Sequence, residues 1–296
     1  MPTLREIRRR ISGVRSTEKI TKAMKMVAAA KLRRAQAGVY AARPYAKKIA
    51  ELMGHLSGST DMSENPFAVE REVKGVAIVV VTADRGFCGA FNSNIVKATN
   101  ELISSKYQNL LPAGKVRLYC VGKKGADFFS RRKCNVAGNY SGIFHDLQLS
   151  AARNLTADVV KGYLDESFDR VEIVYNEFKN VIQQRLLIEQ FLPIPHEQMK
   201  KETEKRVELQ YIYEPNSTSI LEALIPKHLE YQMWRVLLES NAAGEGARMA
   251  AMDNASENAT ELIQTLSLDY NKARQAAITK ELLEVVSGAE ALTASS

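Results

Sequence analysis

The chain has 296 residues, of which 45% are hydrophobic and 25% charged, and it carries a formal net charge of +7 at pH 7. This composition is ordinary for a soluble protein with one large or two smaller cores, and no apolar run approaches the roughly 20 residues that span a bilayer. The three cysteines show no CxxC or metal-ligand spacing, which argues against a disulfide framework and predicts reduced thiols.

The first predicted element is a long helix over residues 3 to about 56, with Pro44 and Gly54 as candidate kinks or a stop. Its Arg-rich, acid-poor start raises a transit peptide as an alternative, but the apolar pattern continues into the next segment, so we interpret it as mature protein. The apolar residues fall in two sets that are out of phase with each other: Leu4, Ile7, Ile11 and Val14, then Ile20, Met24 and Val27.

The positive charge is concentrated in this helix. Residues 1–50 hold fourteen Lys or Arg and two acids, a net charge of +12 against +7 for the whole chain. A helix so basic favours an acidic protein, a nucleic acid or an anionic membrane surface as its partner.

The middle of the chain alternates strands with helices, which predicts a small, parallel, doubly wound (Rossmann-like) α/β core. Two paired edge strands with a mobile loop between them, residues 195–205, should complete the sheet. The predicted strands are 76–81, 116–121, 171–178, 181–191 and 207–213, and the helices between them are 90–105, 126–132 and 148–166.

The turn after the first strand, Asp84 to Gly89, lies where nucleotide-binding folds place a phosphate loop. Its sequence DRGFCG matches neither GxGxxG nor the P-loop pattern, so we interpret it as a strand-to-helix turn. The four histidines are scattered and no nucleophile elbow is present. We therefore predict no catalytic site, no metal site and no cofactor, and we expect Trp234 to pack in a core or helix seam.

A second long helix should begin after an N-cap at Asn216 or Ser217 and run almost to the C-terminus. The sequence thus divides into an N-terminal helix (1–57), a central domain (70–214) and a C-terminal helix (217–290). Small and apolar residues of the last helix alternate in four-three spacing, typical of a coiled-coil seam that pairs antiparallel with the first helix. They are Met252, Ser256, Ala259, Ile263, Leu266, Tyr270, Ala273 and Ala277.

Three separated motifs resemble the gamma subunit of F-type (bacterial-type) ATP synthases, in that family's order. They are ITKAMKMVAA at 20–29, TADRGFCG at 82–89, and ARM at 247–249 followed by YNKARQAAIT at 270–279. The resemblance covers essentially the whole chain. It implies an antiparallel coiled coil of the long N- and C-terminal helices, flanking the small α/β domain.

The resemblance also implies the function of a central rotor shaft without a catalytic site of its own. The implied partners are the alpha and beta subunits of the catalytic hexamer, the epsilon subunit and the proton-driven membrane c ring. No presequence and no chloroplast-type cysteine-bearing segment is recognisable, so we expect a peripheral location at the cytoplasmic face of a bacterial plasma membrane.

Residue by residue, the resemblance implies three contact regions. Arg274, Gln275 and Thr279 match residues that hydrogen-bond a loop of beta. A second group, on the side of beta's acidic lever, comprises Lys22, Met24 and Lys25, with Arg248 at a similar level on the opposing helix. A third, at the foot beside epsilon and the c ring, comprises Tyr211, Tyr213 and Glu214.

The chain departs from the family at Gly244 and Gly246, where the usual pattern is Ala-Ser-Glu. Each glycine costs about 1 kcal/mol relative to alanine in a helix, which predicts a locally softer shaft. Two alternatives remain from the residues alone: a basic coiled-coil nucleic-acid binder, and a phosphate-using enzyme built on the α/β domain.

Overall fold

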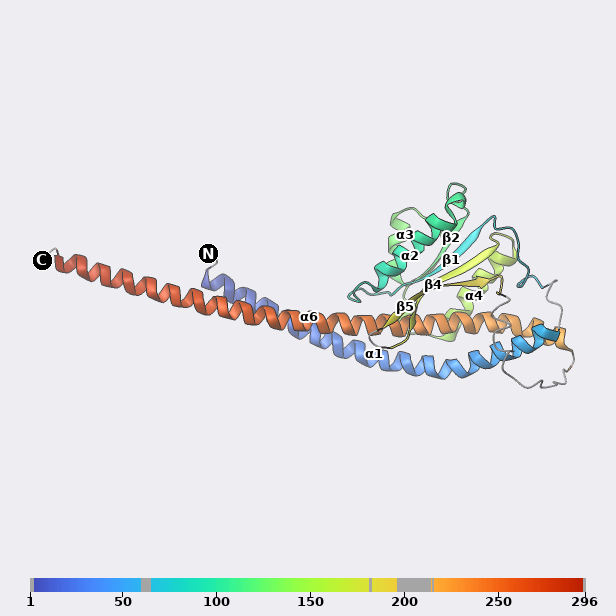
Figure 1. Ribbon diagram of the computed structural model, residues 1–296, viewed down its shortest axis with the longest axis horizontal. Helices are drawn as coiled ribbons and strands as arrows, with labels where there is room; N and C mark the ends of the chain where they lie inside the picture. The colour runs from blue at the N-terminus through green and yellow to red at the C-terminus, as the bar shows by residue number, and fades with distance from the viewer. Residues whose placement is uncertain (1–2, 60–64, 181–182, 196–213, 215, 295–296) are drawn as a thin grey trace. The chain divides into compact units, whose positions relative to one another are not determined.

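The computed structural model describes residues 3–59, 65–180, 183–195, 214 and 216–294, and it contains a sheet flanked in sequence by two long helices (Figure 1). This confirms the predicted mixed α/β fold with long terminal helices. The helices are α1 (Leu4–Ser59), α2 (Phe91–Lys106), α3 (Lys123–Arg131), α4 (Leu149–Leu164) and α6 (Ser217–Ala294), with 3-10 turns η1 (Gln108–Leu110) and η2 (Ile143–His145). The strands are β1 (Val76–Val81), β2 (Val116–Val121), β3 (Val136–Tyr140), β4 (Arg170–Phe178) and β5 (Gln184–Leu192).

The five strands form one sheet in the order β3-β2-β1-β4-β5. The first four are parallel and β5 pairs antiparallel with β4 at the edge. Strand β3 was not predicted, because its sequence VAGNY contains Gly138 and Asn139, two residues that strands disfavour. The predicted partner strand 207–213 and most of the predicted loop 195–205 lie outside the described residues.

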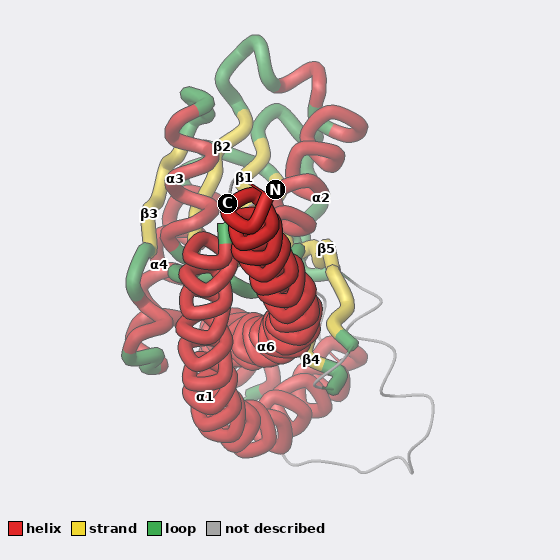
Figure 2. Tube along the Cα trace, turned by 90° about the vertical axis from the view of Figure 1, so that its left-hand side faces the viewer, coloured by secondary structure: helices red, strands yellow, loops and turns green. Residues whose placement is uncertain are grey.

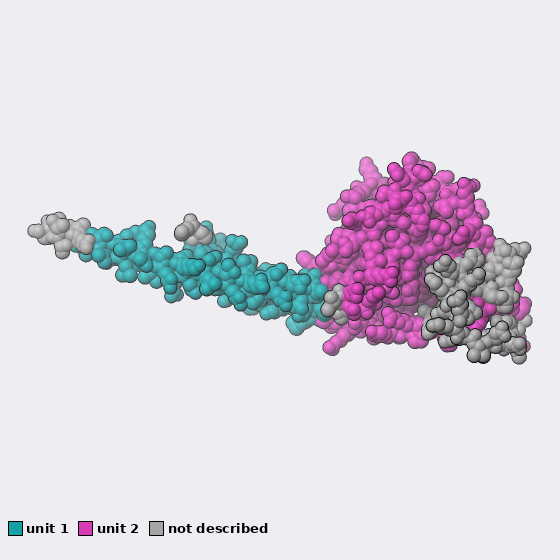
Figure 3. All heavy atoms as spheres, viewed as in Figure 1, with its two compact units in different colours: residues 1–27, 249–296 teal, residues 28–248 magenta. Residues whose placement is uncertain are grey.

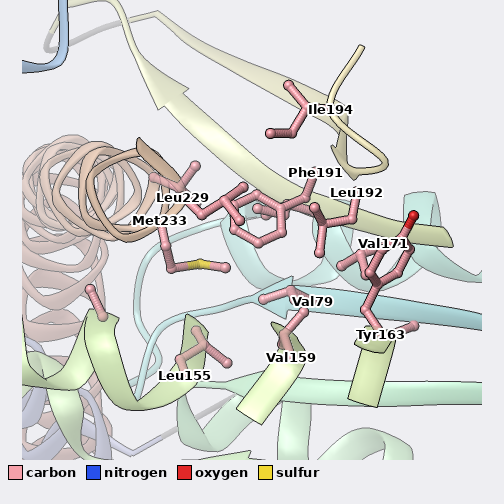
Figure 4. Packing of buried hydrophobic residues seen from close by; sticks show 14 of the residues in the cluster. Val79, Leu155, Val159, Tyr163, Val171, Phe191, Leu192, Ile194, Leu229 and Met233 are labelled. Atoms are coloured by element: carbon pink, nitrogen blue, oxygen red, sulfur yellow. The ribbon is translucent and has the colours of Figure 1, made fainter. Parts of the chain in front are cut away.

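Strand β1, at the centre of the sheet, is buried on both faces, and helices cover the sheet (Figures 1 and 2). In β1, Ala77, Val79 and Val81 point to the face that packs against α4, α6 and the end of α1, where Leu155, Met233 and Met53 belong to the same core cluster (Figure 4). Because side chains alternate along a strand, the even-numbered residues of β1 point to the other face, which α2 and α3 cover. A continuous apolar run such as VAIVVV, β-branched except at Ala77, is typical of a strand buried on both faces.

The turns at the carboxyl ends of β1 and β2 fit closely together. Gly122 has φ +86, and a Cβ there would lie 2.1 Å from the carbonyl oxygen of Thr82. The Thr82 hydroxyl in turn accepts a hydrogen bond from the Gly125 amide at 2.8 Å. Only glycine permits both the backbone conformation and the approach at position 122.

Two compact units divide the chain (Figure 3). Residues 1–27 and 249–296 make up the first unit, and residues 28–248, which include the sheet, make up the second. Each unit contains part of α1 and part of α6.

Within the second unit, α1 and α6 run antiparallel. A Cβ on Gly38 would lie 3.1 Å from the Leu238 side chain, and the rings of Tyr45 and Tyr231 lie 4.2 Å apart. Helix α1 continues through Pro44 to Ser59, so neither of the candidate breaks ends it. The predicted N-cap at Asn216 is confirmed, since its Oδ1 accepts a hydrogen bond from the Ser219 amide at 2.8 Å.

In the first unit the helices are also antiparallel, and the predicted seam of α6 is confirmed, because each of its eight residues is buried or half-buried. The predicted phase break in α1 is wrong. Ile20 and Val27 are 60% and 58% exposed, whereas Thr21 and Ala28 are buried. The buried face of α1 keeps one phase by passing through small side chains, which a search for large apolar residues overlooks.

Candidate functional site

The helix pair of the first unit is held closely together by a polar contact in its seam. The hydroxyls of Thr21 and Ser256 lie 2.7 Å apart, and both residues are buried. Each hydroxyl also lies within hydrogen-bond distance of a carbonyl of its own helix, 3.0 Å from Thr21 to Glu18 and 2.8 Å from Ser256 to Met252. Because each hydroxyl has one proton, one of the two donates across the seam and the other donates to its own helix. Small residues at these positions let the two backbones approach, and the hydrogen bond fixes the register of the pair.

Charged side chains flank this contact. Lys25 of α1 pairs with Asp253 of α6, and the Glu18 carboxylate accepts a bond from Lys22 at 2.6 Å and from the Thr260 hydroxyl at 3.2 Å. The hydrogen bond from Lys22 lowers the pKa of the Glu18 carboxyl. Lys22 is largely exposed, so its cation stays available to a partner on this face.

Met24 is half-buried beside Lys25, and therefore offers only part of its side chain to a partner. The exposed cations on α1 before this point include Arg5, Arg8, Arg9, Arg10, Arg15 and Lys19, and α6 adds Lys272, Arg274 and Lys280 in the same unit. The structure thus places the predicted basic surface on a solvent-facing part of α1.

Arg274, Gln275 and Thr279 lie together on α6, and all three are exposed. Positions i, i+1 and i+5 of a helix span about 140° of its circumference. The Thr279 hydroxyl donates to the Gln275 carbonyl at 3.0 Å, so its lone pairs stay free to accept a hydrogen bond. The side chains of Arg274 and Gln275 are exposed to solvent beside it. The sequence therefore identified three side chains that share one accessible face.

Large apolar side chains are exposed next to these residues, and sequence reasoning missed them. Ile278, Leu282, Leu283, Val285 and Val286 are between 47% and 70% exposed near the end of α6. On α1, Met26 is 67% exposed, beside Ile20 and Val27. Gathered apolar residues that face solvent typically mark a protein interface. Each of these apolar residues lies outside the seam positions of its helix, and this offset could have identified them from the sequence.

Arg248 makes contacts within the second unit rather than projecting freely. Its guanidinium donates to the carbonyls of Arg85 and Gly86, each at 3.3 Å, and pairs with Glu245 at 2.6 Å. Its side chain is 11% exposed. This predicted contact residue therefore anchors the 84–89 turn to α6.

The 84–89 turn is otherwise held by Asp84. Its carboxylate accepts hydrogen bonds from the amides of Lys123 at 2.9 Å, Gly142 at 2.7 Å and Phe144 at 3.3 Å. These bonds connect the loops that follow β1, β2 and β3, which supports the interpretation of DRGFCG as a structural turn.

A second polar cluster ties α6 to the edge of the sheet. The Arg235 guanidinium lies 2.9 Å from Glu189 of β5 and 3.6 Å from Glu239, and the Tyr175 hydroxyl donates to Glu189 at 2.8 Å. Burial raises the pKa of both Tyr175 and Glu239. Separating these charges would leave a partly buried charge without its partner, which is destabilising, so the cluster fixes how α6 lies on the sheet.

The third predicted contact group comprises Tyr211, Tyr213 and Glu214. Glu214 is exposed just before α6, while Tyr211 and Tyr213 lie outside the described residues. Trp234 packs against the hydrophobic core as predicted. Cys88 and Cys120 are buried free thiols, and burial raises the pKa of Cys120 to about 12.

Comparison with known proteins connects these features. A sequence profile of the family described as ATP synthase matches residues 3–292. The chain is 51% identical over 293 residues to the ATP synthase gamma chains of Cytophaga hutchinsonii and of Chlorobaculum tepidum, covering 99% of each sequence.

Solved structures agree with this likeness. A chain in the central stalk and c-ring structure of the Tetrahymena thermophila mitochondrial ATP synthase is 25% identical, with a TM-score of 0.59 over 80% of this chain and 99% of that one. A chain of the Euglena gracilis mitochondrial enzyme is 22% identical, with a TM-score of 0.67 over 98% of this chain and 95% of that one, and it supports the fold.

Proposed function

The chain belongs to the ATP synthase gamma chain family, and from this premise we infer that it is the central stalk of such an enzyme, a non-catalytic subunit. The observation that carries this function is the likeness over the full length, with 51% identity to bacterial gamma chains. In this function the stalk transmits torque between an ion-driven membrane ring and the catalytic subunits, and so couples ion flow to ATP synthesis or hydrolysis.

The surface of the first unit suits that function. A stalk can drive a catalytic subunit only if it favours one conformation over another, because a contact of equal strength with both shifts no equilibrium. Here α1 presents exposed cations, and the end of α6 presents exposed apolar side chains such as Leu282 and Val285. A subunit in contact with one side therefore meets different chemistry from a subunit in contact with another.

We propose that the alpha and beta subunits surround the first unit. Arg274, Gln275 and Thr279 would hydrogen-bond a loop of beta, which their shared exposed face permits. The cations of Lys22 and Lys25 would meet an acidic segment of beta, with Met24 between them. The nearby apolar residues of α6 would be covered by the same subunits, which would stabilise the complex by about 1.5–3 kcal/mol for each fully buried side chain.

Two further contacts are proposed for the second unit. Glu214, with Tyr211 and Tyr213, would meet the epsilon subunit and the c ring. Arg248 would reach a partner only through the part of its guanidinium that its bonds to Arg85 and Gly86 leave accessible. We keep the division into helix 1–57, domain 70–214 and helix 217–290 as a proposal about the domain organisation of the chain.

The location follows from the complex. Among the described residues, none of the helices combines the length and the apolar character needed to cross a membrane. We propose peripheral association with the cytoplasmic face of a bacterial plasma membrane through the c ring.

The nucleic-acid alternative is not supported, because the family match accounts for the basic helix and for the α/β domain together. An enzyme built on the α/β domain loses its main argument as well, since Asp84 and Arg248 engage the 84–89 turn in contacts within the chain.

Reconstitution tests the proposed function. The full chain is mixed with alpha and beta subunits from the same organism, and the ATPase activity of the purified complex is measured for the unchanged protein and for Arg274→Ala/Gln275→Ala. We expect a stable complex in both cases and an activity lower by roughly tenfold in the variant, the effect of losing charged hydrogen bonds that act on the catalytic step.

Lys280→Ala is the matched control. Lys280 is exposed on the side of α6 away from Arg274 and Gln275, and it forms a surface ion pair with Glu284 at 3.6 Å. Its activity should equal that of the unchanged protein. Failure to form any complex with matched subunits would refute the stalk function, and equal activities of both variants would refute the contact residues alone.

A further inference from the structure

Two cations of α1 in the first unit are already paired with carboxylates of the same chain. The ammonium group of Lys22 lies 2.6 Å from Oε1 of Glu18, one turn earlier on α1. Lys25 pairs across the helices with Asp253 of α6. These two lysines are the cations for which we propose contact with an acidic segment of beta, so an internal partner occupies each of them before any subunit arrives.

The other cations of α1 in this unit lack such partners. All of them are exposed, and none forms an ion pair with a residue that the structure describes. They are Arg5, Arg8, Arg9, Arg10, Arg15 and Lys19. Internal carboxylates therefore coincide with the proposed contact cations and do not accompany the basic helix as a whole.

Both paired ammonium groups remain within reach of another protein. The side chain of Lys22 is 59% exposed and that of Lys25 is 40% exposed. The Glu18 carboxylate is held more firmly, since its side chain is 19% exposed and the Thr260 hydroxyl of α6 donates to it at 3.2 Å. A lysine ends in a flexible four-carbon stem, so its ammonium group can turn from an internal carboxylate to an external one.

Internal pairing changes what a partner gains from the contact. A partner's carboxylate that approaches a paired ammonium group has to share the cation, and the internal carboxylate, which carries the same charge, repels it. Exposed ion pairs are weak, so the exchange of one for another changes the free energy little. A turning stalk has to leave each catalytic subunit that it meets, and such exchangeable pairs allow this.

We propose that Glu18 and Asp253 are positioning residues that compete with the partner subunit for Lys22 and Lys25. In the free chain they hold the two ammonium groups close to the helix pair. In the complex they keep the ion pairs with the partner weak enough to break as the stalk turns. This inference rests on the proposed stalk function and on the contact of both lysines with an acidic segment.

Removal of an internal carboxylate should therefore strengthen binding. Glu18→Gln and Asp253→Asn keep the size of each side chain and remove its charge. The affinity of each full-length variant for the matched alpha and beta subunits is measured by surface plasmon resonance at fixed ionic strength. We expect the Kd to fall by about twofold to fivefold in each variant, the range for an exposed ion pair. A purely structural role predicts the opposite sign, because a loosened helix pair would bind less well.

Turnover should change in the other direction. In the reconstituted complex, the maximal ATPase rate of Glu18→Gln should fall by about twofold, because a tighter contact dissociates more slowly. The ATP concentration at half-maximal rate should not rise, since the substitution lies on the stalk and not at a nucleotide site. Tighter assembly together with slower turnover is a combination that lost folding or a lost contact would not produce.

Two further variants serve as controls. Glu257→Gln removes one negative charge from an exposed position of α6 that has no ion pair within the described part of the chain. Its affinity for the alpha and beta subunits should equal that of the unchanged chain. Glu18→Gln/Lys22→Ala tests the pairing itself, because without the ammonium group the loss of the carboxylate should bring no gain over Lys22→Ala alone.

Equal or weaker affinity of either carboxylate variant would overturn the function assigned to that residue. An equal gain in Glu257→Gln would reduce the effect to net charge and would overturn the proposal as well. If the unchanged chain forms an active complex and Glu18→Gln behaves in the same way, the stalk function stands and the competition alone is refuted. Failure of the unchanged chain to assemble would refute the stalk function, and this inference with it. Circular dichroism of each variant confirms that the helices form.

Discussion

The hydroxyls of Thr21 and Ser256 lie 2.7 Å apart across the two antiparallel helices of the first unit, with both residues buried. This is a place where the chain uses small polar side chains instead of large apolar ones. The contact keeps the helices close and sets their register, which a pair that transmits torque needs.

Ser256→Leu should therefore destabilise the helix pair by about 1–3 kcal/mol, because a larger side chain overpacks the seam and removes the bond to Thr21. Chemical denaturation followed by circular dichroism measures the change in the free energy of unfolding. Glu257→Leu is the control, since Glu257 is exposed on the same turn of α6. Equal stability of the two variants would show that the helices are not closely packed at Ser256.

Arg248→Ala should destabilise the second unit by about 3 kcal/mol, because it leaves the buried Glu245 carboxylate without its partner and frees the carbonyls of Arg85 and Gly86. Denaturation monitored by the fluorescence of Trp234, the single tryptophan, measures this loss. Combining it with Glu245→Gln should recover part of the stability, since the unpaired charge is removed. A variant as stable as the unchanged chain would favour a contact with a partner subunit over an internal anchor.

Gly244→Ala should stabilise the chain by about 1 kcal/mol, because alanine is the better helix former. The added Cβ would lie 3.4 Å from the Phe91 ring, an ordinary van der Waals contact. Gly162→Ala provides the contrast, since a Cβ there would lie 2.6 Å from the Phe168 ring and must push it away. Melting temperatures of both variants test this prediction, and no gain for Gly244→Ala would count against the softening assigned to this part of the helix.

His228 should make the fold sensitive to mild acid. Burial, with the nearby positive charge of Arg235, lowers the pKa of this histidine to about 4, against about 6.5 in the unfolded chain. Between these values the unfolded chain binds a proton that the folded chain does not, so the free energy of unfolding falls as the pH drops from 6.5 towards 4. The full loss is about 3 kcal/mol.

His228→Gln should remove this part of the pH dependence. The difference in unfolding free energy between the variant and the unchanged chain, followed from pH 7 to pH 4.5, isolates the histidine from the carboxylates, which both proteins share. Parallel curves would mean that His228 titrates normally in the folded chain.

The sequence by itself determined the elements whose patterns are long or extreme. The apolar run VAIVVV predicted a strand buried on both faces, and the four-three spacing from Met252 to Ala277 predicted a helix seam; the structure confirms both. The sequence also predicted that Arg274, Gln275 and Thr279 share one side of the helix, because their spacing along the chain fixes their positions around the helix axis. Three motifs carried the likeness that named the family.

Only the tertiary structure decided which side chains meet across elements. It placed Ile20 and Val27 in solvent and Thr21 in the seam, because closeness of two helices depends on the partner helix and favours small residues there. It also turned Arg248 inward onto carbonyls more than 160 residues earlier in the chain. Hydrogen bonds between distant segments leave no periodic trace in a sequence, so the contact of Arg248 with the 84–89 turn became visible only once the chain was folded.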